Sequence, residues 1–558
     1  YATFREFSSR NVSTNRYDAV SPSDEKRGLY FVPGTSGWEL RELDGSVHVF
    51  DSSGKWASTR DRHTSVQKVA TYNGSNQLTT VTMPDGRSES FTYAPSGKLA
   101  TITEVGVAGA ASRQWTYTWS GDDLSTILRP DATYWEFQYS EANHPGYMTR
   151  MDLVTSTGTH RVMGGWEYDS VGNVVKSWKG DVAFTGPNAV DRLTYDWTNP
   201  LLPTQLVVTD ALIPATISTY VIERDSNSTK PKVRSISGDC PICGAGPNSR
   251  YDYTDTANPL LPTRITDGLG KKTDFAYNAN GLLTARTEAA MSTMARTTAW
   301  IFGNSSYPGL VTQIDRPSTA GGSFVRRTEY ILNANGDPTT IRESGREGGV
   351  GFSYDTVYTY NDAGMVLTVD PPAAGGADVV TYTYDPARGG LIPVKRFDPT
   401  INGTVLETTY VHDPFNRRTS EIDVNGVETI TAYDALNRID LGTQKGATSA
   451  DDIVKEYAYN GFGDLDLVTL PEGNLIDYVF SDTNGDLAKG RLTAIEKKPN
   501  ASMPGERIAY VYDNLGKKSR EEMQSWNGTG WVAESWRDYE YYGRCQLKKV
   551  IDASGNAQ

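Results

Sequence analysis

The chain of 558 residues carries 54 Lys and Arg against 68 Asp and Glu, and its formal net charge is −14. This acidic balance, without a basic stripe, argues against nucleic acid and anionic membranes as partners, and no apolar run has the length of a membrane span. Three cysteines are too few for a disulfide framework, whereas 53 Gly and 32 Tyr are typical of a turn-rich β protein.

The first 70 residues lack the regular pattern that follows, and we expect residues 1–70 to form an irregular opening segment. From residue 71 to 558 one short phrase recurs, as in Tyr168-Asp-Ser-Val-Gly172-Asn-Val174. His412 occupies the place of the tyrosine in one copy. With its looser copies the phrase starts at Tyr72, Tyr93, Tyr117, Tyr168, Tyr277, Tyr330, Tyr360, Tyr384, Tyr433, Tyr459 and Tyr512.

Each phrase predicts a β-hairpin turn. The tyrosine ends an alternating or β-branched stretch, which indicates a strand. The Asp or Asn after it folds back onto nearby backbone amides, and the Gly or Asn three residues further on adopts positive φ at low cost. The apolar residue that follows opens the next strand.

A second kind of turn lies between successive phrases, as in Asp85-Gly86 and Asn425-Gly426. Asp-Gly and Asn-Gly between apolar runs are strong hairpin signals. Tyr72 and Tyr93 lie 21 residues apart, and Tyr433 and Tyr459 lie 26 apart. Two strands and two turns account for such a period, so the sequence predicts an all-β chain of consecutive antiparallel hairpins.

Chemical motifs are scarce in this sequence. Cys240-Pro-Ile-Cys243-Gly resembles half of a zinc ribbon, since two thiolates on one turn can share a tetrahedral metal. Three interpretations stay open: unmodified or disulfide-linked turn thiols, a zinc site completed by Cys545 or another chain, and a redox pair. We expect no other cofactor, no confident metal site and no catalytic residue, because no nucleophile elbow, P-loop or zinc-protease motif occurs.

The tyrosine phrases with their alternating Asp-Gly turns resemble the RHS or YD-repeat family over nearly the whole chain. Residues 37–54 resemble the usual start of such a repeat region, and residues 60–62 its link to the first repeats. The resemblance implies hairpins wound spirally into a large hollow shell, here a partial one. Bacterial polymorphic toxins, cocoon-forming subunits of insecticidal toxin complexes and animal teneurins share the family.

The resemblance also implies a function. We expect a non-catalytic, secreted or cell-surface shell segment of a bacterial polymorphic toxin, whose partners are its own C-terminal toxin cargo beyond residue 558 and a delivery apparatus or cell surface. The alternative is a teneurin-like adhesin or structural protein that binds glycan or protein. Its candidate sugar-stacking residues, which are more often core residues, are Trp115, Trp119, Trp135, Trp166, Trp178 and Trp197.

Overall fold

The computed structural model of the chain describes residues 6–7, 16–17, 19–21, 28–32, 37–63, 67–211, 215, 217–224, 231–238, 248–317, 325–372, 378–401, 404–481, 489–513, 515–542 and 546–557. In these ranges the regular structure consists of short β-strands and three single 3₁₀ turns, η1 (Val107–Gly109), η2 (Pro386–Arg388) and η3 (Ser449–Asp451). The predicted all-β class is confirmed.

The first strands are short and are followed by the start of a long ribbon. They are β1 (Glu6–Phe7), β2 (Arg16–Tyr17), β3 (Ala19–Ser21), β4 (Gly28–Val32), β5 (Gly37–Arg41), β6 (Val47–Phe50), β7 (Trp56–Arg60), β8 (Gln67–Tyr72), β9 (Leu78–Thr82), β10 (Ser88–Tyr93), β11 (Leu99–Val105), β12 (Ser112–Ser120), β13 (Asp123–Leu128), β14 (Tyr134–Gln138), β15 (Arg150–Val154) and β16 (His160–Tyr168).

The middle of the ribbon continues in the same manner. Its strands are β17 (Val174–Lys179), β18 (Val190–Thr198), β19 (Gln205–Asp210), β20 (Ile217–Arg224), β21 (Pro231–Gly238), β22 (Arg250–Asp252), β23 (Arg264–Thr266), β24 (Lys272–Tyr277), β25 (Leu283–Glu288), β26 (Arg296–Ile301), β27 (Gln313–Pro317), β28 (Val325–Leu332), β29 (Pro338–Glu347), β30 (Val350–Tyr360) and β31 (Val366–Asp370).

The last part includes β44, the longest of the described strands. Its strands are β32 (Val380–Tyr384), β33 (Pro393–Ile401), β34 (Thr404–His412), β35 (Arg418–Ile422), β36 (Glu428–Tyr433), β37 (Ile439–Gln444), β38 (Ile453–Tyr459), β39 (Leu465–Thr469), β40 (Leu475–Phe480), β41 (Leu492–Lys498), β42 (Glu506–Tyr512), β43 (Lys518–Trp526), β44 (Trp531–Tyr542) and β45 (Gln546–Asp552).

Strand pairing follows the order of the sequence without exception from β4 onward. Each strand pairs antiparallel with the next up to β45, β2 pairs with β4, and β1 pairs with β3 in a separate small sheet. Between described residues no pairing joins β45 back to the start, so the sheet is open. Strand β8 runs from Gln67 to Tyr72 across residue 70, and the boundary expected there stays a prediction.

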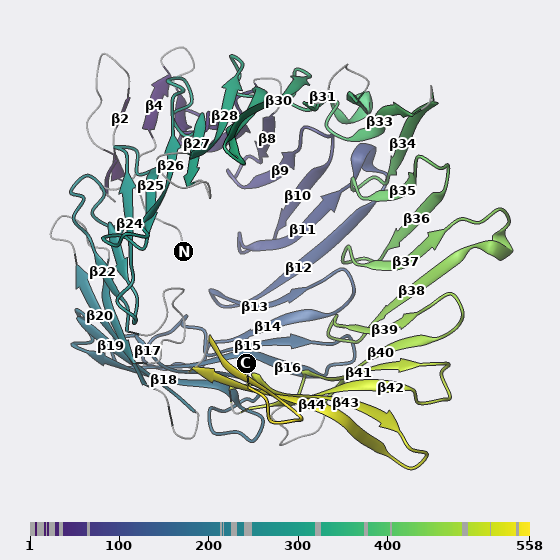
Figure 1. The fold of residues 1–558 in the computed structure, drawn as a ribbon. Coiled ribbons are helices and arrows are strands. Elements are labelled where there is room, and N and C mark those ends of the chain that lie inside the picture. The colour runs from purple at the N-terminus through teal and green to yellow at the C-terminus, as the bar shows by residue number, and fades with distance from the viewer. Residues whose placement is uncertain are drawn as a thin grey trace.

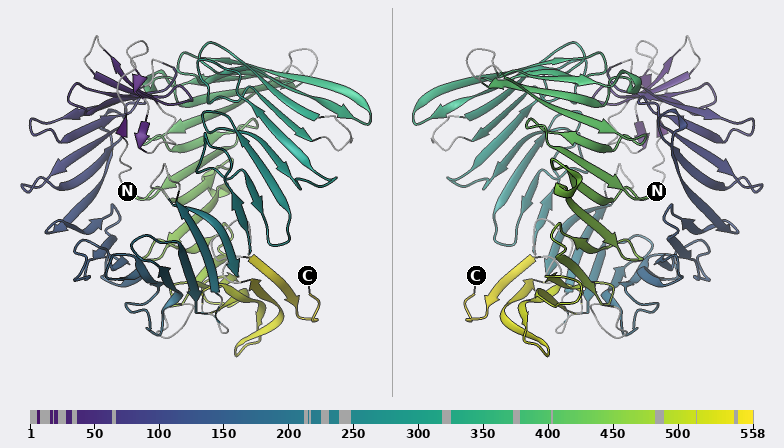
Figure 2. Two further views of the ribbon diagram at one scale, coloured as in Figure 1. Left: turned by 90° about the vertical axis from the view of Figure 1, so that its left-hand side faces the viewer. Right: turned by 90° about the vertical axis from the view of Figure 1, so that its right-hand side faces the viewer.

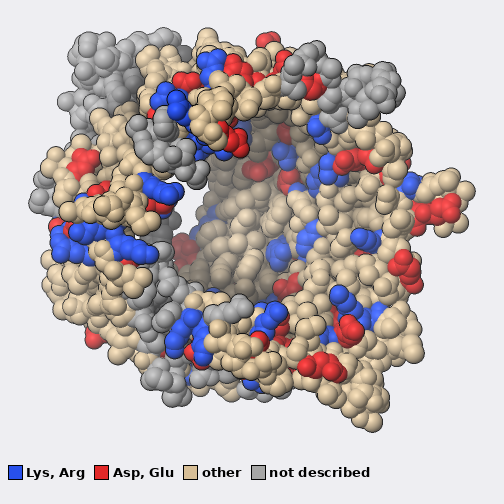
Figure 3. Space-filling view, in the orientation of Figure 1, with Lys and Arg blue, Asp and Glu red and all other residues tan. Residues whose placement is uncertain are grey.

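The ribbon coils into a hollow shell one sheet thick. In Figure 1 the green strands β34–β38 have come round to lie beside the blue strands β10–β15, and Figure 3 shows the deep hollow that the sheet surrounds. The accessible surface of the chain is 30143 Å². A compact protein of 61.2 kDa would expose about 20,000 Å². The excess follows because a single sheet exposes both of its faces, and it agrees with the predicted spiral, partial shell.

The turn after each tyrosine phrase has the predicted chemistry. Asp169 illustrates it: one carboxylate oxygen accepts the backbone N–H groups of Val171 and Asn173, both at 2.9 Å, and Gly172 has φ of +94°. A β-bulge accompanies the turn, with Tyr168 opposite Val174. Burial acts to raise the pKa of Asp169, but hydrogen bonds from Asn173 and the turn amides outweigh it and hold the pKa below its ordinary value.

The phrase tyrosines form a column along the ribbon, which links each hairpin to the one before it. Each hydroxyl donates to a backbone carbonyl 15 to 22 positions earlier, at 2.5 to 3.0 Å. The tyrosines of this column are Tyr72, Tyr93, Tyr168, Tyr277, Tyr360, Tyr384, Tyr433, Tyr459 and Tyr512. The tyrosine is therefore both a strand residue and a tie between neighbouring repeats.

Two of the looser copies place another residue in the column. The bulge position near the end of β12 holds Trp119, whose indole N–H donates to the Leu99 carbonyl at 2.7 Å. The corresponding position at the end of β28 holds Leu332. Tyr117 and Tyr330 lie two residues earlier on the same strands, so they share a face of the sheet with the column position.

Candidate functional site

The most distinctive site of the shell is the seam where one turn of the ribbon meets the next (Figures 1 and 2). Side-chain hydrogen bonds across it join residues 274 to 331 positions apart. Two kinds of turn meet there. The tyrosine turns follow even-numbered strands such as β28, β34 and β38. The turns at the other end of the strands, here called opposite turns, follow odd-numbered strands such as β5, β9 and β15. At the seam, tyrosine turns of the later coil, which comes second in the sequence, contact opposite turns of the earlier coil, which comes first.

The first seam cluster begins at the turn between β5 and β6. The backbone N–H of Gly309 donates to the Leu43 carbonyl at 2.8 Å. Gly45, with φ of +92°, faces the ring of Tyr307, and a Cβ at this position would lie 2.5 Å from ring carbons. The ring of Tyr307 therefore occupies the space that a side chain at position 45 would need.

A buried charge network completes the first seam cluster. The Nε2 atom of His63 lies 2.9 Å from both carboxylate oxygens of Asp337, and Arg62 donates to the same carboxylate at 2.9 Å. The side chains of His63 and Asp337 are 6% and 3% exposed. Burial acts to raise the pKa of Asp337, but hydrogen bonds from His63, Arg62 and Asn333 outweigh it and lower the pKa. Gly364 packs on the imidazole, where a Cβ would lie 2.3 Å from Cε1.

The second seam cluster joins η1 to the turn between β34 and β35. The backbone N–H of Val107 donates to the Pro414 carbonyl at 2.8 Å. The Asn416 amide donates to the carboxylate of Asp85, which is 6% exposed. Gly106 has no room for a side chain, because a Cβ would lie 2.7 Å from Pro414.

Arg113 extends the second seam cluster toward the tyrosine turn after β36. Its guanidinium lies 4.4 Å from the centroid of the Phe415 ring and donates to the side chains of Asn437 and Glu104. The stacking of a planar cation on an aromatic face is attractive, and more so where water is excluded. The Arg113 side chain is 9% exposed. This residue therefore bridges both coils with a single buried side chain.

The third seam cluster centres on Arg161. Its Nη1 atom donates to the Asp464 carboxylate at 2.6 Å, and the guanidinium lies 4.0 Å from the centroid of the Phe462 ring. Beside it, Gly461 contacts Thr155, where a Cβ on the glycine would lie 3.3 Å from the threonine Cβ. All three later-coil residues belong to the tyrosine turn after β38.

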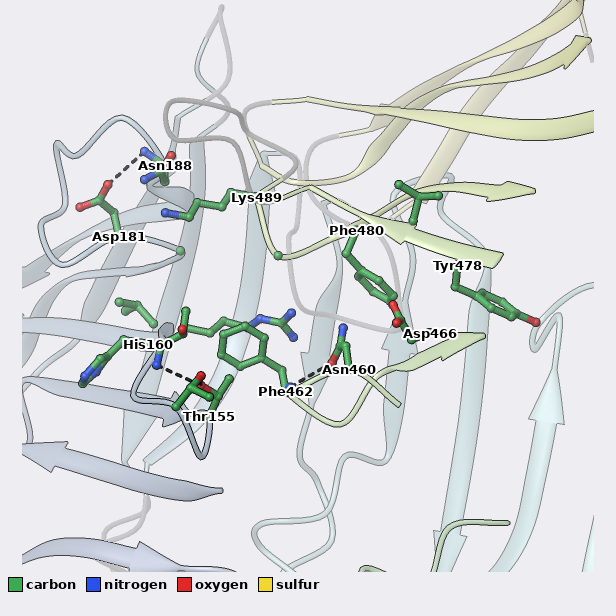
Figure 4. A pocket seen from close by; sticks show the side chains of 18 of the residues that line it. Thr155, His160, Asp181, Asn188, Asn460, Phe462, Asp466, Tyr478, Phe480 and Lys489 are labelled. Carbon is green, nitrogen blue, oxygen red and sulfur yellow. Dashed lines mark hydrogen bonds between the residues drawn. The ribbon is translucent and has the colours of Figure 1, made fainter. Parts of the chain in front are cut away.

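A cavity of about 880 Å³ interrupts the seam next to Arg161 (Figure 4). The earlier coil contributes hydroxyl and amide side chains, and the later coil contributes aromatic rings. Lining residues include Thr155, Ser156, Thr157, Asn188, Asn460, Phe462, Tyr478 and Phe480. Two lining acids are engaged by the protein itself: Asp181 accepts the Asn188 backbone N–H at 3.1 Å, and Asp477 binds Lys498. The two coils are thus not packed continuously along the seam.

The predicted site residues lie in different places. Cys240, Cys243 and Cys545 fall outside the described residues, so the thiol interpretations stay predictions. Across the ranges that the structure describes, no group of three His, Cys, Asp or Glu side chains is arranged to hold a metal ion. His412 holds a tyrosine-column position opposite Arg418, and burial, together with Arg388 and Arg418, lowers its pKa.

The tryptophans singled out for sugar stacking have structural roles at three positions. Trp178 is buried, and its indole donates to the Asp181 carbonyl at 2.9 Å. The indole N–H of Trp197 donates to the Val174 carbonyl at 2.8 Å, as that of Trp119 does to Leu99. Sequence reasoning did not find the seam residues, because their partners are hundreds of positions away.

No helix in the described part of the chain is long and apolar enough to cross a membrane.

The fold and the seam define a class of structure, an open spiral of hairpin repeats that surrounds a hollow. Comparison with solved structures finds chains of Tc toxins. This chain is similar to a chain of the TcdB2-TccC3-Cdc42 crystal structure, with 13% identity and a TM-score of 0.47 over 95% of this chain and 27% of that one. It is also similar to a chain of the Photorhabdus luminescens Tc holotoxin pore, with 12% identity and a TM-score of 0.48 over 95% and 33%.

The chain thus spans about a third or less of the length of the solved chains it matches. No protein-family profile and no curated protein matches the sequence.

Proposed function

We propose that this chain is a non-catalytic shell segment of a bacterial polymorphic toxin that encloses a C-terminal toxin domain. The observation that carries the proposal is the hollow, single-sheet wall, with its 30143 Å² of accessible surface. A chain that buries so little of its own surface forms a wall around a space instead of a compact core. Secretion or cell-surface delivery, and a delivery partner, belong to the same proposal.

The chemistry of the wall supports an enclosing role over a catalytic one. The conspicuous buried charges of the seam are paired with each other, as His63 and Arg62 are with Asp337. Paired groups fix structure, whereas a catalytic group needs access to substrate. The wall visible inside the hollow in Figure 3 consists mainly of uncharged residues with scattered charges of both signs.

The test uses the natural gene together with whatever follows the codon for Gln558. We expect a further domain whose proteolysis is much slower in the whole protein than as an isolated domain. Mild denaturant that opens the shell should abolish the protection. A gene that ends near Gln558, or a following domain cleaved as fast in the whole protein as alone, would contradict the proposal.

A teneurin-like adhesin is the second candidate, favoured by exposed aromatic residues on the hairpin of β43 and β44. Trp526 and Trp536 are 39% and 37% exposed, and Trp526 contacts Trp531 at 5.5 Å between ring centroids. Exposed tryptophans can stack on sugar rings. Binding on a glycan array that is lost in Trp526→Ala would support this role, and an array without hits would count against it.

The cysteine pair also remains a proposal with a direct test. If Cys240 and Cys243 form a zinc site completed by Cys545 or another chain, protein purified without chelator should contain bound zinc. Substitution of both cysteines by serine should remove the metal. A metal-free wild-type protein with titratable thiols would favour simple turn cysteines.

A further inference from the structure

We infer that the shell wall opens along the seam, by separation of the two coils of the ribbon, while the strand ladder within each coil stays intact. This inference goes beyond enclosure, because it identifies where the wall parts. It rests on the three seam clusters and on the cavity beside the third, and it does not require any particular cargo.

The backbone connections across the seam are few. Between described residues two backbone hydrogen bonds cross it, from Gly309 to Leu43 and from Val107 to Pro414. A single strand pair makes a continuous ladder instead: β29 and β30 are in register from Thr340 opposite Val357 onward. Separation of the coils therefore breaks far fewer backbone hydrogen bonds than separation of any two long strands.

The ion pair of the third seam cluster is of a kind that water can replace. Arg161 and Asp464, at 2.6 Å, are 17% and 35% exposed, so both charges lie close to solvent. Partly exposed ion pairs contribute little net stability because each charge is hydrated again when the pair opens. The cavity of about 880 Å³ beside Arg161 removes apolar packing at the same place.

The geometry of the spiral lets the coils part without local distortion. One coil contains many strands between the two sides of the seam, since Arg161 and Asp464 are 303 positions apart. A gap at the seam requires only a small change of twist at each strand pair, and sheet twist varies over a wide range between proteins. Tyrosine turns and opposite turns also make their contacts end to end, so no strand has to slide past another.

A disulfide across the third seam cluster tests the inference. The Cβ positions of Thr155 and Gly461 lie 3.3 Å apart, close to the spacing of a disulfide, about 3.5–4.5 Å. The double variant Thr155→Cys/Gly461→Cys should form the bond on oxidation, as verified by mass spectrometry. Each single variant, and the reduced double variant, controls for the native cysteines and for the loss of threonine.

The readout is amide hydrogen exchange at single-residue resolution. In the wild type we expect the seam amides of Val107 and Gly309 to exchange much faster than the ladder amide of Tyr330, which donates to Thr312 at 2.9 Å. Oxidation of the double variant should slow Val107 by about tenfold or more and leave Tyr330 unchanged. The inference would be overturned if the seam amides of the wild type exchanged as slowly as that of Tyr330. It would also be overturned if the exchange rate of Val107 did not change after verified disulfide formation.

A second pair of variants shifts the opening in the other direction. Asp464→Asn removes the Arg161 ion pair across the seam and should speed exchange at Val107. The matched control is Asp274→Asn, which removes the bidentate pair with Arg264 inside the ladder. Equal effects of the two variants on Val107 would count against opening at the seam. Protection of a cargo plays no part in this readout, so the inference and the proposed function fail independently.

Discussion

Neighbouring strands and neighbouring coils are held together in different ways. Within the ribbon, β29 and β30 form a regular antiparallel ladder. Successive repeats are also joined by hydrogen bonds such as that from the Tyr360 hydroxyl to the Pro338 carbonyl. Across the seam, adhesion is concentrated in a few buried residues, above all Asp337 and Arg113. A ladder distributes its stability over many similar contacts, whereas a seam of this kind depends on single side chains. Substitutions should therefore differ sharply between the two regions.

The largest effect is expected at Gly364. Alanine there suffers the strain of a positive φ, +77°, and its Cβ would lie 2.3 Å from the His63 ring. Displacement of the buried His63–Asp337 pair should cost about 3–5 kcal/mol. Gly426→Ala is the matched control, because it has φ of +80° and open space around it; only the backbone strain of about 1–2 kcal/mol applies. Urea unfolding followed by tryptophan fluorescence measures both, and equal losses would refute the special role of the seam glycine.

The next effect is expected for Asp337→Asn, which leaves His63 and Arg62 without a buried anion. We expect a loss of about 3 kcal/mol in urea unfolding. Asp315→Asn, which removes a partly exposed bidentate pair with Arg327 inside the ladder, should cost about 1 kcal/mol or less.

The stability that ionised Asp337 contributes should depend on pH in one direction. Because folding lowers the pKa of Asp337, this stabilisation is fully present above the pKa of the unfolded state, about 3.9. It is lost as the pH falls through the lower pKa of the folded state. The wild type should lose more stability than Asp337→Asn between about pH 4 and pH 2. Parallel acid curves for the two proteins would contradict the assignment.

A smaller effect is expected in the tyrosine column. Tyr360→Phe removes the hydrogen bond to the Pro338 carbonyl, 2.7 Å long, and should cost about 1 kcal/mol. Tyr358→Phe, on the neighbouring stacked ring, should be close to neutral. Burial, together with the charge of Asp337, raises the pKa of Tyr360 to about 12, so its absorbance should titrate late in alkaline solution. A similar cost for both variants would show that the ring, not the hydroxyl, links the repeats.

The smallest effect is expected at an exposed ion pair within the ladder. Arg286 and Glu288 lie 2.8 Å apart with side chains 49% and 57% exposed. Glu288→Gln should change the free energy of unfolding by no more than about 0.5 kcal/mol. A larger change, measured in the same urea series, would indicate that ladder charges matter as much as seam charges.

The sequence predicted the local structure well where one side chain dictates one turn. The Asp169 and Gly172 turn follows from amide capture and positive φ, both set within five residues. It was less informative about which residue enters the tyrosine column, since Tyr117 and Tyr330 resemble the phrase while Trp119 and Leu332 occupy the bulge. Counting four positions back from Gly336 would have identified Leu332. The same count from Gly121 gives Tyr117, because the turn after Trp119 is shorter, with Ser120 paired to Asp123.

By itself the sequence determined the succession of hairpins, the alternation of tyrosine and Asp-Gly turns, and hence an all-β ribbon. These are local choices, made by residues a few positions apart. Only the tertiary structure decided that Arg62 and His63 meet Asp337, and that Arg161 meets Asp464. Those contacts depend on the twist summed over every strand of a full coil, which no short stretch of sequence specifies.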